Sequence, residues 1–211
     1  MTADAVGAKG IGDGERVAGA RVYLRLVELA DCGERYLGWL LDAQVNRFLE
    51  TRFVQQTPGR IEEFVRRMRR SPDDYLFAIV QSDTDTHVGN LKIGPVNRVH
   101  GYADISYFIG ERDAWSKGIA TEAINIATRF AFERLGLHRV QAVVYADNRA
   151  SASALERAGY SLEGTCREKV VVEDRRSDQL IYGILERDRA GVQQKTDASG
   201  GLSPDEAFPA S

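Results

Sequence analysis

Cysteine and histidine are scarce in this chain of 211 residues, and their positions exclude several kinds of site. The two cysteines, Cys32 and Cys166, lie far apart in the sequence, so they form neither a disulfide framework nor a zinc motif. The three histidines are scattered as well, which argues against a metal centre built from His and Cys ligands. The sequence therefore predicts reduced thiols and no bound metal.

Long apolar runs and an excess of one charge are also missing. No stretch approaches the roughly 18–20 apolar residues that cross a bilayer, and the N-terminus lacks the apolar block of a secretory signal. A net charge of −3 gives no basic footprint for nucleic acid. The sequence predicts a cytoplasmic protein that binds neither membrane nor nucleic acid, and it leaves monomer and homodimer open.

What the chain does contain is sufficient for one globular domain. Its hydrophobic content of 43% and charged content of 28% are ordinary for such a domain. Residues 1–20 are rich in Gly and Ala, and residues 188–211 have few large apolar side chains. Both ends are therefore predicted to be disordered tails that flank a domain over residues 21–187.

Hydrophobic periods of two and of 3.6 residues alternate along this domain and predict a mixed α/β fold with helices on both faces of the sheet. The first strand is followed by two helices, the second of which has Thr57 as N-cap and Pro58 at the first helical position. The next three strands form an antiparallel meander. Strands are expected over 20–28, 74–82, 86–96, 102–110, 138–146, 160–172 and 179–185, and helices over 32–50, 58–70, 117–135 and 148–158.

One stretch joins a strand to a helix in a way that suits an anion. In "YFIGERDAWSKGIATEAI", residues 107–124, a strand ends, a polar loop follows, and a helix opens at Gly118. Helix N-termini carry unpaired N–H groups and a partial positive charge. Gly118 and Ala120 let the backbone approach a ligand, and Lys117 adds a charge. The loop matches neither common phosphate fingerprint, and a plain glycine turn remains the alternative.

A second strand-to-helix junction follows at "DNRASASALERAGY", residues 147–160. Asn148 is a good N-cap and Ser151 falls at the third helical position, so a capped helix explains both residues without a site. The second junction nevertheless repeats the arrangement of the first, which makes a shared function worth considering.

Together the two junctions resemble the GNAT superfamily of acetyl-CoA-dependent acyltransferases, whose motif is roughly [Q/R]-x-x-G-x-[G/A]. Here the motif reads Trp115-Ser116-Lys117-Gly118-Ile119-Ala120. The continuation to Gly164 resembles the RimJ/RimL-like branch, which shows W-G-K-G-x-A-T-E-A, then N-x-x-S and G-[FY]-x-x-E-G. The resemblance covers about residues 21–187. It implies a mostly antiparallel sheet splayed between its fourth and fifth strands, with acetyl-CoA as the acyl-donor cosubstrate.

The resemblance also implies where the cofactor lies. The fourth strand would pair its backbone with the pantetheine arm, and a backbone N–H near Ile109 would serve as oxyanion donor. The following loop would hold the pyrophosphate, Asn148 would contact the arm, and Ser151 would lie near the thioester sulfur. The implied cofactor-binding residues are Phe108, Ile109, Gly110, Trp115, Ser116, Lys117, Gly118, Ile119, Ala120, Thr121, Asn148 and Ser151.

The acid and the base depart from the wider family. Leu155 stands where many members have a tyrosine acid, so Ser151 is the catalytic acid that this branch suggests. Val170 stands where some members carry a glutamate base, and Glu168 would share its face of an ideal strand.

Further candidates for the catalytic base are Glu50, after the first helix, and Asp104 with His100, at the start of the fourth strand. Asp178 has similar standing. Surface contacts explain each of these side chains as well, and a water relay would replace any of them.

The acceptor implied by the resemblance is a primary amine that receives the acetyl group directly, without an acyl-enzyme. The strand block from residue 87 to 110 resembles branch members that act on small amino-sugar or natural-product amines. If the acceptor is a sugar nucleotide, the candidates for binding its phosphates are Arg47, Arg52 and Lys92. A protein or peptide N-terminus is the alternative within this chemistry, and a non-catalytic acyl-CoA-binding module is the alternative outside it.

Overall fold

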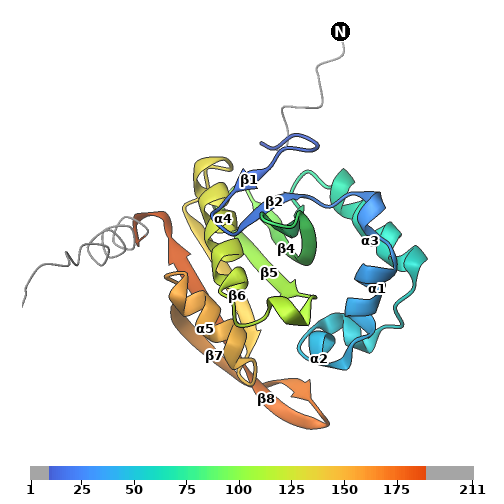
Figure 1. The fold of residues 1–211 in the computed structure, drawn as a ribbon. Coiled ribbons are helices and arrows are strands. Elements are labelled where there is room, and N and C mark those ends of the chain that lie inside the picture. The colour runs from blue at the N-terminus through green and yellow to red at the C-terminus, as the bar shows by residue number, and fades with distance from the viewer. Residues whose placement is uncertain (1–9, 189–211) are drawn as a thin grey trace, which may run out of the picture.

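An eight-stranded sheet runs through residues 10–188, the part of the chain that the computed structural model describes (Figure 1). The strand order is β1-β2-β3-β4-β5-β6-β8-β7, and every neighbouring pair is antiparallel except β5 with β6. The strands are β1 Val17–Ala18, β2 Val22–Leu26, β3 Tyr75–Gln81, β4 Thr86–Asn97, β5 Tyr102–Ile109, β6 Arg139–Tyr145, β7 Ser161–Val172 and β8 Arg175–Leu185.

The parallel pair β5 and β6 is the point at which the sheet opens. The two strands pair only over residues 102–104 and 139–141. Beyond these residues β5 continues to Ile109 and β6 to Tyr145 without pairing with each other. This is the predicted splay between the fourth and fifth strands, counted without the short β1. The inner edges of the splay leave backbone polar groups without a neighbouring strand, and such groups suit an extended ligand.

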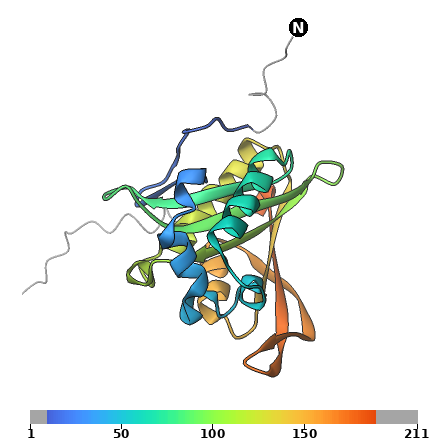
Figure 2. The same cartoon turned by 90° about the vertical axis from the view of Figure 1, so that its right-hand side faces the viewer.

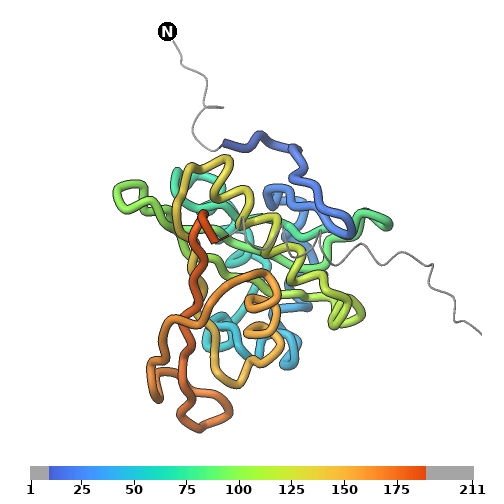
Figure 3. The backbone as a smooth tube through the Cα atoms, turned by 90° about the vertical axis from the view of Figure 1, so that its left-hand side faces the viewer, coloured from blue at the N-terminus to red at the C-terminus, as the bar shows by residue number. Residues whose placement is uncertain are grey.

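Helices cover both faces of the sheet, as predicted. Figure 2 shows the face covered by α1 Glu34–Leu41, α2 Ala43–Asn46 and α3 Pro58–Arg70, and Figure 3 the face covered by α4 Ile119–Glu133 and α5 Arg149–Arg157. The larger hydrophobic cluster packs under α4 and α5, and a second one under α1 and α3. Within residues 10–188, no helix has the length and apolarity needed to cross a membrane.

Two predicted elements differ from the structure. The helix expected over 32–50 is divided into α1, α2 and the 3-10 turn η3 Glu50–Phe53, because Asp42 leaves the helical conformation and its side chain caps α2. The strand expected over 179–185 begins earlier, at Arg175, because the hairpin between β7 and β8 turns tightly at Glu173 and Asp174, which both have positive φ. The predicted start of α3, with Thr57 as N-cap and Pro58 after it, is confirmed.

The N-terminal boundary also differs from the prediction. Residues 10–20 were expected in the disordered tail, but Ile11 is buried and β1 pairs with β2. The Arg134 side chain donates to the Gly10 carbonyl oxygen at 2.8 Å, which fastens this segment to the end of α4. One buried isoleucine and a few long-range contacts order a segment whose composition did not suggest it. The predictions for residues 1–9 and 189–211 lie outside the described residues.

Candidate active site

The helix α4 begins in a turn that no side chain caps. Gly118 is left-handed with φ 75°, Ser116 also has a positive φ of 61°, and the first helical hydrogen bond runs from Glu122 N–H to the Gly118 carbonyl. In the described part of the chain, the backbone N–H groups of residues 116–121 have no protein acceptor. These free donors, together with the helix dipole, make the turn suited to an anion.

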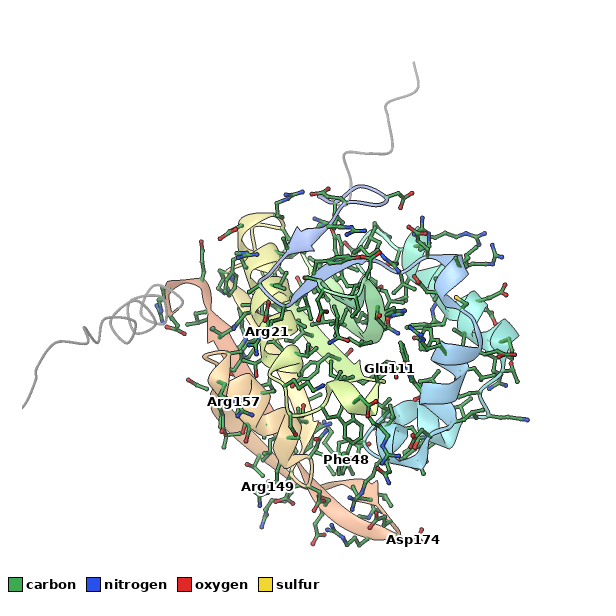
Figure 4. All side chains as sticks on the ribbon, in the orientation of Figure 1. Arg21, Phe48, Glu111, Arg149, Arg157 and Asp174 are labelled. Carbon is green, nitrogen blue, oxygen red and sulfur yellow. The ribbon has the colours of Figure 1, made fainter. Side chains whose placement is uncertain are left out.

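A cation from the N-terminal segment lies against this turn. The Arg21 guanidinium donates to the Lys117 carbonyl oxygen at 2.9 Å and to the Glu122 carboxylate at 3.0 Å. A Cβ on Gly118 would lie 3.2 Å from Arg21 Nη2, so the guanidinium covers the glycine. Arg21, labelled in Figure 4, remains largely exposed and adds positive charge to the turn.

The carboxylate that holds Arg21 is itself held in the charged form. Burial disfavours the ionised Glu122, but hydrogen bonds from the backbone and the guanidinium of Arg21 outweigh this effect and lower its pKa. No motif predicts Arg21 as part of this site, because it lies 96 positions before its partner Lys117.

The loop between β5 and α4 is fastened to the end of β5. The Trp115 indole N–H donates to the Ile109 carbonyl oxygen at 2.9 Å. The backbone N–H of Trp115 donates to the Arg112 carbonyl and closes the 3-10 turn η4 Arg112–Ala114. Trp115 therefore offers no backbone donor to a phosphate, and the predicted loop narrows from residues 115–121 to residues 116–121.

The alternation along β5 decides which backbone groups face the splay. Gly110 N–H donates to the Val88 carbonyl of β4 at 2.8 Å, so the N–H groups of Tyr107 and Ile109 point the other way, into the opening. Ile109 thus keeps its predicted availability. The predictions for Phe108 and Gly110 need correction, because the Gly110 N–H is used by β4 and the Phe108 ring packs under α1.

The helix α5 begins differently. The Asn148 side chain accepts the Ser151 N–H at 3.2 Å, which confirms the predicted cap. Ser151 Oγ lies 2.8 Å from the hydroxyl of Tyr107, which also donates to the Ser151 carbonyl oxygen at 3.0 Å. Burial raises the pKa of Tyr107 to about 12, so this hydroxyl stays protonated at neutral pH. No motif predicts a role for Tyr107, because its partner lies on a different element.

Glu50 lies beside the end of β6. Its carboxylate accepts a hydrogen bond from the Tyr145 hydroxyl, and the Phe48 ring packs edge-on against Tyr145 with centroids 6.1 Å apart. Arg52 donates to the Val171 carbonyl of β7 at 2.7 Å. The segment 47–52 therefore spans from α2 across the end of β6 to the β7–β8 hairpin, and Figure 4 shows Phe48 beside this hairpin.

Asp104 lies where β5 and β6 stop pairing. Its carboxylate accepts a hydrogen bond from the Gln141 amide at 2.9 Å, and these two residues form the last parallel pair. His100, the other candidate base predicted near the start of this strand, lies exposed in the turn before β5. Of the two, Asp104 is the side chain at the point where the strands begin to separate.

Glu168 does not share the face of Val170, contrary to the prediction from ideal alternation. A bulge interrupts β7 between residues 166 and 170, where Glu168 has a positive φ of 50° and is exposed. Its backbone N–H donates to the Asp178 carboxylate at 2.8 Å, which occupies the other candidate base. Val170 packs in a cluster with Tyr145. The bulge thus separates Glu168 from the position at which a glutamate base was expected.

The three cations considered for a phosphate-bearing acceptor all have protein partners. Arg47 pairs with Glu173 at 2.9 Å, and Lys92 pairs with Asp74 at 3.0 Å. Arg52 donates to the Leu49 and Val171 carbonyls. Each of the three is therefore already engaged within the folded chain.

A cavity of about 670 Å³ lies between α1, α2 and the loop after β5. Trp39 of α1 sits so close to Gly110 that a Cβ there would lie 2.1 Å from its ring, and its indole donates to Glu111 at 3.2 Å. The cavity thus adjoins the anchored end of β5. Its lining residues are Arg35, Gly38, Trp39, Asp42, Gln44, Gly110, Glu111, Arg112, Asp113 and Trp115.

Comparisons with known proteins agree with this geometry. A family model described as "Acetyltransferase (GNAT) domain" matches residues 21–161. YjcK of Bacillus subtilis (strain 168), described as a probable N-acetyltransferase, is 30% identical over 180 residues, which cover 81% of this chain and 97% of that protein.

Two solved structures share the fold. Spermidine N-acetyltransferase from Vibrio cholerae, in complex with CoA and spermine, has a TM-score of 0.72 at 20% identity, covering 81% of this chain and 98% of the other. RimJ of Mycobacterium smegmatis, in complex with CoA-disulfide, has a TM-score of 0.72 at 22% identity, covering 85% of this chain and 89% of the other.

Proposed function

This chain belongs to the GNAT acetyltransferases, and on that basis, together with its resemblance to the RimJ/RimL-like branch, we propose that it transfers the acetyl group of acetyl-CoA directly to the primary amine of a small molecule. The observation that carries the proposal is the pair of helix starts beside the splay. One is open and cationic, and the other presents the Ser151 hydroxyl.

The open helix start fits the pyrophosphate of the cofactor. Residues 116–121 offer unpaired N–H groups, Lys117 and Arg21 add positive charge, and Gly118 has no side chain to block approach. The inner edge of β5 fits the pantetheine arm, because it carries N–H groups with no strand to pair with. Asn148 has its side-chain oxygen in the cap, which leaves its amide nitrogen for the arm.

The residues of this chain would then divide the chemistry as follows. The Ile109 N–H would donate to the thioester carbonyl oxygen and stabilise the negative charge that forms when the amine attacks. Ser151 would give its proton to the departing thiolate, and Glu50, Asp104 or a water molecule held by them would accept the proton that the amine loses. The fold would supply the alignment of the two reactants.

The bridge made by residues 47–52 supports a small acceptor. Arg52 and Arg47 tie this segment to the β7–β8 hairpin, through the Val171 carbonyl and the Glu173 carboxylate. A long peptide lying across the end of β6 would have to displace the bridge, whereas an amino sugar or a natural-product amine would not. Because the nearby arginines are engaged, we propose an acceptor without phosphate groups.

Calorimetry and a thiol-release assay test this function together. Acetyl-CoA should bind the purified protein with a constant near the micromolar range, about −8 kcal/mol. Amino sugars, polyamines and free-N-terminal peptides should then be compared as acceptors by the rate of thiol release. Faster release with peptides than with small amines would overturn the proposed acceptor. Binding without release for any amine would instead indicate a non-catalytic acyl-CoA-binding module.

A further inference from the structure

The contact between Tyr107 and Ser151 joins the two arms of the splay. Tyr107 belongs to β5, and Ser151 lies 44 residues later in the first turn of α5, the helix that follows β6. The last residue of β5 that pairs with β6 is Asp104, so backbone pairing no longer holds the two arms together at Tyr107. A side-chain contact therefore forms where backbone pairing has ended.

The chemistry of the two groups determines the direction of these hydrogen bonds. The carbonyl oxygen of Ser151 can only accept, so the Tyr107 hydroxyl donates to it at 3.0 Å and also reaches Ser151 Oγ at 2.8 Å. Burial keeps the phenol protonated at neutral pH. Ser151 is also held by its own N–H, which donates to the Asn148 side chain. Both the backbone and the hydroxyl of Ser151 are thus fixed.

Two other buried tyrosines on this face have a different arrangement. The Tyr160 hydroxyl lies 2.7 Å from Thr128 Oγ1, and the Tyr182 hydroxyl donates to Glu156 at 2.8 Å. These contacts fasten α4 and α5 to their neighbours and involve no residue of the proposed site. Tyr107 differs in that its partner is the proposed acid.

We propose that Tyr107 is a positioning residue that holds the Ser151 hydroxyl at the splay and stabilises Ser151 Oγ when its proton passes to the leaving thiolate. The inference rests on the proposed function. As Ser151 loses its proton, negative charge develops on Oγ, and the Tyr107 proton moves from the carbonyl oxygen toward it. A hydrogen bond to a charged oxygen is roughly twice as strong as one between neutral groups.

The proposed step balances as follows. The C–S bond of the tetrahedral intermediate breaks and its electron pair goes to sulfur, while the O–H bond of Ser151 breaks and an S–H bond forms. Because a phenol is a stronger acid than an aliphatic hydroxyl, Tyr107 shares its proton with Ser151 Oγ while the charge lasts and regains it in full when Ser151 is reprotonated. The proton that the amine nitrogen loses to Glu50, Asp104 or their water then passes to Ser151 and restores its hydroxyl, so that one amide and one thiol are formed.

A kinetic double-mutant cycle tests this role. Tyr107→Phe, Ser151→Ala and the double variant should be compared with the wild type by kcat, by the KM for acetyl-CoA, and by CoA affinity from calorimetry. Tyr107→Phe should lower kcat about 10- to 100-fold and change CoA affinity by less than about twofold. In the Ser151→Ala background, Tyr107→Phe should have no further effect on kcat.

Tyr160→Phe is the matched control, because it removes another buried tyrosine hydroxyl that contacts a helix. It should leave kcat within about twofold of the wild type. Equal losses from Tyr107→Phe in both backgrounds, or an unchanged kcat in the single variant, would overturn the positioning role. A wild type that neither binds acetyl-CoA nor releases thiol would overturn the proposed function, and this inference with it.

Discussion

The two helix starts beside the splay, at α4 and at α5, have opposite designs. At α4, Gly118 is left-handed, no side chain caps the helix, and the first N–H groups are unpaired. At α5, Asn148 caps the helix through the Ser151 N–H, and the Ser151 hydroxyl is held by Tyr107. Both follow a strand that borders the opening.

The two designs suit different tasks, one binding an anion and the other taking part in the reaction. A helix start without a cap leaves its donors for an external anion, whereas a capped start has used them and can only present a side chain. We therefore expect the α4 junction to determine cofactor affinity and the α5 junction to determine turnover. Substitutions at the two junctions should separate these quantities, and the following predictions test that separation.

Gly118→Asp should have the largest effect, at the α4 junction. The new carboxylate would lie against the Arg21 guanidinium, neutralise it and repel the phosphates, so that CoA affinity falls about 100-fold or more. Calorimetric titration with CoA measures this loss. Gly136→Asp is the control, because Gly136 has a similar φ of 65° at the other end of α4 with open space around it. Equal affinity in the two variants would show that the phosphates bind elsewhere.

Ser151→Ala should act on turnover alone, at the α5 junction. Loss of a general acid typically slows catalysis about 100-fold or more, while CoA affinity should stay within about twofold. Steady-state thiol release and calorimetry measure the two quantities. Ser153→Ala, in the same helix, should change neither. A Ser151→Ala enzyme as fast as the wild type would remove Ser151 from the mechanism.

Arg21→Gln should weaken CoA binding at the α4 junction, because it removes one positive charge from beside the free N–H groups and the helix dipole. The dissociation constant for CoA should rise about three- to tenfold at low salt, and the difference from the wild type should shrink at high salt because exposed charges are screened. Arg129→Gln removes another exposed α4-side arginine, whose partner is the Ala18 carbonyl, and should leave affinity unchanged. A salt-independent effect of Arg21→Gln would indicate a structural role instead.

The smallest expected effect is a pH dependence of the free energy of unfolding, and it involves the side chains that pack near the end of β5. The partly buried His87 ring packs against Trp39, with ring centroids 4.9 Å apart, and desolvation lowers the pKa of His87 below the usual 6.5. The unfolded chain therefore takes up this proton at a higher pH than the folded protein does. As the pH falls below about 6.5, the free energy of unfolding should decrease.

Urea denaturation at pH 7.5 and pH 5.5 measures this effect. His87→Gln should reduce the difference in unfolding free energy between the two pH values, whereas His100→Gln, at an exposed position, should preserve it. Carboxylates titrate at lower pH, about 4, so they contribute little in this window. A pH dependence that is unchanged in His87→Gln would assign it to another group.

Local patterns in the sequence predicted most of the fold. The caps at Thr57 and Asn148 and the strand order of the meander follow from short-range periodicity and turn chemistry. The interruption of the first helix at Asp42 was missed, because a capping side chain inside an apolar period is hard to tell from a surface aspartate. The bulge that turns Glu168 away had no distinct sequence pattern either.

The candidate site was predicted where it depends on one segment and missed where it joins two. The loop 116–121 and the pair Asn148 and Ser151 are each local, so a motif could locate them. Arg21 lies just before β2 and Tyr107 belongs to β5, and only the folded sheet brings them to the two helix starts. Contacts of this kind depend on register and splay, which a single sequence does not specify.

Calorimetric titration of acetyl-CoA into the wild type and the Gly118→Asp variant tests the central claim most directly. We expect binding near the micromolar range for the wild type, about −8 kcal/mol, and binding at least about 100-fold weaker for Gly118→Asp. No binding by the wild type at about millimolar ligand (about −4 kcal/mol), or equal binding by the two proteins, would contradict the assignment of the cofactor to the start of α4.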